Sequence, residues 1–317
     1  MPSFTFRLAL IVAAIVVGSH IRQAGAQSTR TFVSGHGSDT GSCALVTPCR
    51  TLNYAVTQTS AGGEVAVLDT AGYGPVMVSK SISITAQEGI EAGIAVTSPT
   101  NGVTVSAGPN DVVNLRGLIL TGSGVGVNGI QFNSGKSLTI QNCSIRGFTS
   151  SGIFLVPGAS SIAVFDTILS NNEDGITFSP SANASAFFQR VQSVQNSRYG
   201  FFITSEGIGS TSVVATATDS VAAANGQAGF FVTALANQGQ ITMAIDHSKI
   251  FNNLFGVKVS SPSGFPDQTT VSLTGSSVIG SIQGATQASN SHIWTYGNNT
   301  FPPNDPSVTG LVSVSLQ

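Results

Sequence analysis

The stretch "GIQFNSGKSLTIQNCSIRGFTSSGIFL", residues 129–155, begins and ends with one pattern: a glycine, an apolar residue, a variable residue and a second apolar residue. The pattern returns at intervals of 23 to 29 residues. Its six copies are GIQF (129–132), GIFL (152–155), GITF (175–178), GFFI (200–203), GFFV (229–232) and GVKV (256–259). A repeat period between about 20 and 50 residues is typical of solenoids and other repeat architectures.

Each unit also carries a polar turn and a second alternating run. Asparagine stands four residues before the glycine in four successive units, at Asn171, Asn196, Asn225 and Asn252. Asparagine tolerates left-handed backbone geometry, so this position predicts a turn. The second runs are SLTIQ (137–141), SIAVF (161–165), SVVAT (212–216), QITMA (240–244) and TVSLT (270–274). Two or three short strands per unit form one coil, which needs its neighbours to bury its apolar face.

The period of the apolar residues identifies the kind of solenoid. Helical repeats would need apolar residues at i, i+3, i+4 and i+7, whereas these runs alternate with period two. A propeller blade needs about 40 to 45 residues, and a leucine-rich repeat needs a leucine ladder that is missing here. The pattern therefore predicts an all-β fold, a right-handed parallel β-helix.

Stacked coils place equivalent residues in columns along the helix axis. Because side chains alternate across a strand, the two apolar positions after each glycine should face inward and the residue between them outward. The inward columns are Ile130, Ile153, Ile176, Phe201, Phe230 and Val257, then Phe132, Leu155, Phe178, Ile203, Val232 and Val259. The outward column is Gln131, Phe154, Thr177, Phe202, Phe231 and Lys258.

The N-terminal part predicts export. Arg7, an apolar run over residues 8–18 and Ala24-Gly25-Ala26 have the form of a signal peptide over residues 1–26, so the protein is expected to be secreted or periplasmic. No later segment is apolar enough to span a membrane. Cys43 and Cys49 lie six residues apart, and in an oxidising compartment they favour a disulfide over free thiols. Zinc is the alternative, but further ligands are not nearby in the sequence.

Residues 31–85 resemble the start of many pectin-lyase-like β-helix proteins, in particular uncharacterised exported bacterial members. The resemblance is carried by Phe32-Val33-Ser34, Gly37-Ser38-Asp39, Pro48 and "CRTLNYAVTQTSAGGEVAVLD" (49–69). It implies a short N-terminal capping helix, expected between Thr51 and Ser60 and ended by Gly62-Gly63. The expected organisation is a signal peptide (1–26), a cap (27–63) and a β-helix domain with a C-terminal closing segment (64–317).

Two groups of residues are candidates for function. Phe154, Phe202 and Phe231 in the outward column could form a platform for sugar rings or a partner, unless a turn or the C-terminal tail covers them. Asp166, Asp219 and Asp246 lie nine or ten residues before their glycines, with Arg190 at the same place in another coil. This acidic edge could hold calcium or supply a paired acid and base, or it is a solvated row of turns.

The remaining polar residues are interpreted as structural. Gly35-His36-Gly37 matches a tripeptide of polygalacturonase-type hydrolases, but it lies ahead of the first coil and the Asp and Arg-x-Lys partners are missing, so His36 is expected in a turn. Glu173-Asp174 is expected to be a solvated turn pair. His247 and His292 have no triad-like neighbour.

The sequence therefore predicts a β-helix protein that binds or supports structures at the cell envelope and engages a polysaccharide. A polysaccharide lyase or glycoside hydrolase with an unfamiliar site, and an adhesin-like surface protein, are the alternatives. The formal net charge of −2 gives no reason to expect nucleic acid as a partner. No metal site and no cofactor are predicted, with calcium as an open possibility.

Overall fold

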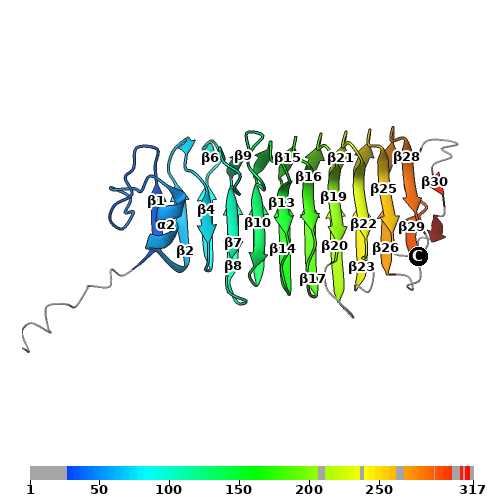
Figure 1. Ribbon diagram of the computed structural model, residues 1–317, viewed down its shortest axis with the longest axis horizontal. Helices are drawn as coiled ribbons and strands as arrows, with labels where there is room; N and C mark the ends of the chain where they lie inside the picture. Colours follow the sequence, from blue (N-terminus) through cyan, green and yellow to red (C-terminus); the bar gives the residue numbers. More distant parts are fainter. Residues whose placement is uncertain are drawn as a thin grey trace, which may run out of the picture.

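The computed structural model describes residues 27–205, 211–235, 239–261, 268–288, 290–301, 308–309 and 311–314. The predicted signal peptide and part of the predicted closing segment lie outside these residues. The described part is an all-β, right-handed parallel β-helix with one short helix, α2 (Leu52–Gln58), at its N-terminal end. The coils stack along a single axis from the blue N-terminal end to the orange and red C-terminal strands (Figure 1).

Three parallel sheets run along that axis. The twelve-stranded sheet contains β1 (Ser28–Val33), β2 (Thr59–Val67), β5 (Ile82–Ala86), β8 (Val112–Arg116), β11 (Ser137–Gln141), β14 (Ser160–Phe165), β17 (Ala184–Gln189), β20 (Ser212–Thr218), β23 (Gln240–Asp246), β26 (Thr269–Thr274), β29 (Ser291–Tyr296) and β31 (Val312–Val314).

The ten-stranded sheet contains β4 (Val76–Val78), β7 (Val103–Ser106), β10 (Ile130–Ser134), β13 (Ser151–Leu155), β16 (Asp174–Phe178), β19 (Tyr199–Thr204), β22 (Ala228–Thr233), β25 (Phe255–Ser260), β28 (Gln283–Gln287) and β30 (Val308–Thr309). The nine-stranded sheet contains β3 (Ala71–Gly72), β6 (Ala92–Ala95), β9 (Leu118–Thr121), β12 (Ser144–Arg146), β15 (Ile168–Ser170), β18 (Gln192–Val194), β21 (Val221–Ala223), β24 (Lys249–Phe251) and β27 (Ser277–Ile279).

The two predicted inward columns form the core. Every residue of both columns is at most 1% exposed, and the strands pair in the predicted register. The rings of Phe201 and Phe230 stack with their centroids 4.4 Å apart and their planes 4° from parallel. The alternation of the six tetrapeptides therefore determined the in-out register correctly.

The asparagine turn position is confirmed in part and corrected by one residue in two coils. Four buried asparagines form a ladder: Asn172, Asn196, Asn225 and Asn253. In each successive pair, the side-chain oxygen of the later residue accepts the backbone N–H of the earlier one, at 2.9 to 3.1 Å. Asn171 and Asn252 instead hold the preceding left-handed position, each with a φ of 56°. Counting back from the glycine therefore placed left-handed residues and ladder residues in one column. The cause is turn length, because three residues join β15 to β16 and β24 to β25, whereas four join β18 to β19 and β21 to β22.

The repeated glycine is required by close packing between coils. A Cβ on Gly200 would lie 2.5 Å from the carbonyl oxygen of Gly229 and 2.9 Å from the side-chain nitrogen of Asn225. Its φ lies outside the left-handed region, so conformational freedom is not the reason for glycine here. The coils approach each other too closely at this corner for any side chain.

Gly200→Ala is therefore expected to destabilise the protein by about 1–3 kcal/mol, because the new methyl group must displace backbone atoms. Gly158→Ala is the matched control, since a Cβ at that position meets nothing within 4 Å. Urea unfolding of both variants measures the difference. Equal free energies of unfolding for the two variants would show that the backbone around Gly200 accommodates a methyl group without loss of stability.

The N-terminal cap has the predicted disulfide and helix, but the helix ends differently. Cys43 and Cys49 are bonded. Thr51 caps α2, and its hydroxyl accepts the backbone N–H of Tyr54 at 3.2 Å. The helix ends at Gln58 because Thr59 is already extended and starts β2, so Gly62-Gly63 lies inside that strand. Among the described residues, no helix is long and apolar enough to cross a membrane.

Candidate ligand-binding site

The predicted outward column lies on the solvent side of the ten-stranded sheet. The strand register aligns Gln131, Phe154, Thr177, Phe202, Phe231 and Lys258 on six successive strands. The three phenylalanines are half-buried, so neighbouring side chains cover them in part. Thr177 is 5% exposed and lies on the strand between those of Phe154 and Phe202.

A pocket of about 250 Å³ opens where this small threonine separates the two rings, and we call it the slot. Because strands repeat at about 4.8 Å, the backbones that carry Phe154 and Phe202 lie roughly 9–10 Å apart. That separation leaves room for a flat molecule between or across the two rings. The slot is lined by Ser150, Ser151, Phe154, Asp174, Thr177, Ser179, Arg198, Phe202, Thr204 and Leu235.

An ion pair between a buried carboxylate and a partly exposed arginine forms one end of the slot. Asp174 is 1% exposed and accepts two hydrogen bonds from the guanidinium of Arg198, at 2.9 and 2.5 Å. The hydroxyl of Thr177 donates to the same carboxylate at 3.1 Å. The hydrogen bond to Asp174 raises the pKa of Arg198. The expectation that Glu173-Asp174 is a solvated pair is therefore wrong for Asp174, because Arg198 from the next coil covers it, while Glu173 remains partly exposed.

Two unpartnered hydroxyls lie at the other end of the slot. The side-chain oxygens of Ser179 and Thr204 are buried, and neither finds a hydrogen-bond partner within the described part of the chain. The residues themselves are 3% and 5% exposed. A buried hydroxyl without a partner costs about 1–3 kcal/mol. Such groups in a native structure call for an explanation, and a ligand is one.

The aromatic cluster is larger than the sequence indicated. The ring of Tyr199 lies 5.2 Å from that of Phe202 and 5.1 Å from that of Phe231. The ammonium group of Lys258 lies 5.2 Å from the ring of Phe231. Phe231 is thus packed between neighbours, whereas Phe154 and Phe202 border the slot. Tyr199, Arg198, Ser179 and Thr204 were missed, because only the strand register places them beside the outward column.

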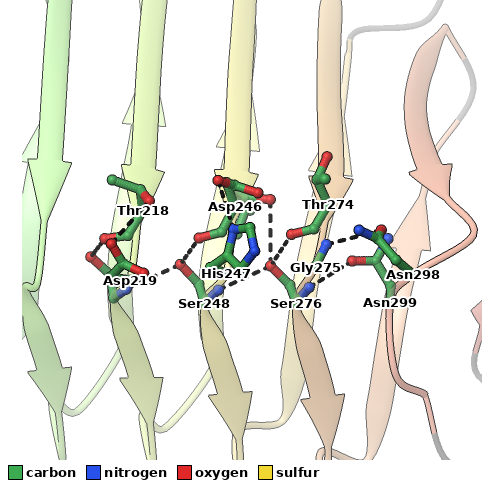
Figure 2. A network of polar contacts seen from close by, with 12 residues as sticks. Thr218, Asp219, Asp246, His247, Ser248, Thr274, Gly275, Ser276, Asn298 and Asn299 are labelled. Carbon is green, nitrogen blue, oxygen red and sulfur yellow. Dashed lines mark hydrogen bonds and ion pairs between the residues drawn. The ribbon is translucent and has the colours of Figure 1, made fainter. Parts of the chain in front are cut away.

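The acidic edge lies at a different corner, in the turns between the twelve- and nine-stranded sheets (Figure 2). Asp246 pairs with Thr218 and not with Asp219, so the predicted column is shifted by one residue. His247 takes the left-handed turn position that Asp219 holds one coil earlier, with φ values of 44° and 52°. The shift has the same cause as the asparagine correction, since the turn after β24 is one residue shorter.

Two of the three carboxylates of this edge are paired within the edge. Arg190 binds Asp166 with two hydrogen bonds, at 2.6 and 3.0 Å. These bonds lower the pKa of Asp166 and raise that of Arg190. His247 contacts the carboxylate of Asp246 at 2.9 Å, which raises the pKa of the imidazole.

Hydroxyls behind these charges hold the turns together. The backbone N–H of Ser220 donates to the hydroxyl of Ser248, and that of Ser248 to the hydroxyl of Ser276, at 3.2 and 3.1 Å. Figure 2 shows the row from Asp219 to Asn299. Residues in the described ranges include no group of three His, Cys, Asp or Glu side chains that could hold a metal ion.

Gly35-His36-Gly37 lies in a turn of the cap, as predicted. The carboxylate of Asp69 accepts the backbone N–H of Gly35 at 2.7 Å and the hydroxyls of Ser34 and Tyr73 at 2.6 and 2.5 Å. These bonds lower the pKa of Asp69 to about 2. The tripeptide therefore joins the cap to the first coil.

The sequence matches the family model of the right handed beta helix region over residues 82–238. This match covers 157 of the 317 residues and agrees with the right-handed parallel β-helix of the structure. Among solved structures, this β-helix protein is similar to the crystal structure of pectate lyase Pel9A, with a TM-score of 0.58 and 15% sequence identity. The match covers 90% of this chain and 82% of that chain, and at this identity it concerns the fold alone. No curated protein sequence matches the chain significantly.

Proposed function

We propose that this β-helix protein binds a polysaccharide through the slot and does not cleave it. The observation that carries the proposal is the combination of two half-buried phenylalanine rings with two buried, unpartnered hydroxyls in one pocket. A sugar ring has apolar C–H faces that pack on aromatic rings and a rim of hydroxyls that both donate and accept hydrogen bonds. The slot offers the rings directly, and it offers the two buried hydroxyls once their side chains rotate toward the sugar.

The positions of the carboxylates favour binding over catalysis. Glycoside hydrolysis by two carboxylates needs both groups on either side of one bond, about 5–10 Å apart. Asp174 in the slot is held by Arg198, and Asp166 by Arg190. Asp219 and Asp246 lie at the corner between the other two sheets, so they cannot reach a ring held in the slot.

A location outside the cytoplasm, in the periplasm or beyond the cell, belongs to this proposal. It is supported by the signal-peptide pattern of residues 1–26 and by the Cys43–Cys49 disulfide, since disulfides persist in oxidising compartments. A role at the cell envelope follows if the polysaccharide is part of it.

Binding of soluble and insoluble polysaccharides to the purified protein tests the proposal. Phe154→Ser combined with Phe202→Ser is expected to weaken binding about five- to 150-fold, because each ring contributes roughly 0.5–1.5 kcal/mol of stacking. Asp219→Asn combined with Asp246→Asn is expected to leave binding unchanged, and so is a chelator, because the slot needs no calcium.

Enzymatic activity is the outcome that would overturn the proposal. Release of unsaturated uronates or of reducing ends by the unaltered protein, lost in the Asp219 and Asp246 double variant, would assign the acidic edge a catalytic role. Binding of a protein partner through the slot in place of any glycan would support the adhesin-like alternative.

A further inference from the structure

The slot continues into a cluster of amide side chains on the same face. Gln131 lies beside Phe154 on one neighbouring strand and beside Thr104 on the other. Its side-chain oxygen accepts hydrogen bonds from Asn101 at 2.8 Å and Asn128 at 3.1 Å. Its nitrogen donates to Asn133 at 2.8 Å. We call Asn101, Asn128, Gln131 and Asn133 the amide cluster.

A second pocket, of about 540 Å³, lies beyond the amide cluster toward the N-terminal end. It is lined by Asn53, Pro75, Val76, Met77, Thr100, Asn101 and Thr104. Asn101 belongs to both the pocket and the amide cluster. The slot, the amide cluster and this pocket therefore follow one another along the outward face, roughly one strand spacing of about 4.8 Å at a time.

The outward column along this face carries no charge from β4 to β22. Its members are Met77, Thr104, Gln131, Phe154, Thr177, Phe202 and Phe231. The charged side chains near the slot are Glu173, Asp174, Arg198 and, beside Phe231, Lys258, and their formal charges cancel. The face therefore offers an anionic ligand no excess of positive charge, whereas amides and hydroxyls satisfy neutral hydroxyl groups.

We propose that the slot and the amide cluster bind successive residues of one uncharged linear polysaccharide lying along the helix axis. The inference rests on the proposed function and adds the class of ligand and its direction. One coil rise is close to the length of one sugar residue in an extended chain, so consecutive residues meet consecutive strands. A uronate-rich chain is disfavoured because this face has no excess positive charge to neutralise it.

Isothermal titration with linear glucose, xylose and mannose oligomers, and with oligogalacturonates of equal length, tests both parts. For at least one neutral series, affinity is expected to rise with each added residue until the chain spans the slot and the second pocket. Oligogalacturonates are expected to bind at least about tenfold more weakly at equal length. Weaker or equal binding of the neutral series would overturn the assignment of an uncharged ligand.

Two variants separate the subsites. Gln131→Ala is expected to remove the gain in affinity with chain length while short oligomers still bind in the slot. Thr204→Val keeps the shape of the side chain but removes an unpartnered hydroxyl, so it should weaken binding of short and long oligomers at least about tenfold. Its thermal stability should stay equal or rise, which a purely structural role of the hydroxyl would not allow.

Thr286→Val is the control, because Thr286 follows Lys258 in the outward column beyond the slot. An unchanged length dependence in Gln131→Ala would overturn the path along the axis and leave the slot as a single site. Failure of every glycan, neutral or acidic, to bind would overturn the proposed function together with this inference. Tight binding of the acidic series alone would overturn only the inference.

Discussion

Phe201→Ala is expected to lower the free energy of unfolding by about 3–5 kcal/mol. The side chain is fully buried, its ring stacks on Phe230 at 4.4 Å, and the ring of Phe188 lies 5.7 Å away. The strand backbones on both sides are held by parallel hydrogen bonds, so the coil cannot collapse around the cavity. Chemical denaturation of the purified protein measures the loss.

Phe202→Ala is the control for that experiment, one residue further along the same strand. Its side chain is half-buried on the outward face, so its removal leaves no closed cavity and should cost much less. Equal losses at both positions would contradict the in-out register, because a slip by one residue exchanges the two faces.

Asn196→Ala is expected to destabilise the protein by about 2–4 kcal/mol, the second large effect. The side-chain oxygen of Asn196 accepts the backbone N–H and the side-chain N–H of Asn172, at 3.1 and 3.2 Å. Both donors are buried. The side-chain nitrogen of Asn172 would keep the carbonyl oxygen of Ile145 at 3.3 Å, but its backbone N–H would lose its partner, and a buried group without a partner costs about 1–3 kcal/mol. The side-chain nitrogen also donates to Ser193 and Asn225, at 3.1 and 3.0 Å.

Gln195→Ala provides the matched comparison, because Gln195 is exposed and precedes Asn196 in the same turn. Both substitutions replace an amide side chain with alanine in the same turn. The difference between them therefore measures the buried ladder and not the general effect of introducing alanine. Thermal unfolding should show a large decrease for Asn196→Ala and a small one for Gln195→Ala. Similar melting temperatures for the two variants would mean that water replaces the ladder without loss.

The sequence predicted the fold and most of its core for a physical reason. A strand that alternates with period two has one apolar face, and units of 23 to 29 residues can bury that face only by stacking. Phe201 and Phe230 were assigned to the core and Phe202 and Phe231 to the surface on this basis, and the structure confirms both assignments. The positions of polar residues in the turns were predicted less accurately, because the turns vary in length by one residue.

The candidate sites show the limit of counting along the chain. Asp246 was aligned with Asp219 by its distance from the glycine, whereas hydrogen bonds between β20 and β23 align it with Thr218. Asp174 looked like a solvated turn residue because Arg198 lies one coil away in sequence. Its burial depends on a contact that spans 24 residues.

By itself, the sequence determined the architecture, the inward columns, the outward row of aromatic rings and the cysteine pair, because these depend on local alternation and a repeated period. Only the tertiary structure decided that Phe154 and Phe202 border a pocket while Phe231 is packed, and that the hydroxyls of Ser179 and Thr204 lack partners. The reason is that a pocket on a stacked sheet is formed by side chains from several coils, and the register between coils is set by hydrogen bonds across them rather than by spacing along the chain.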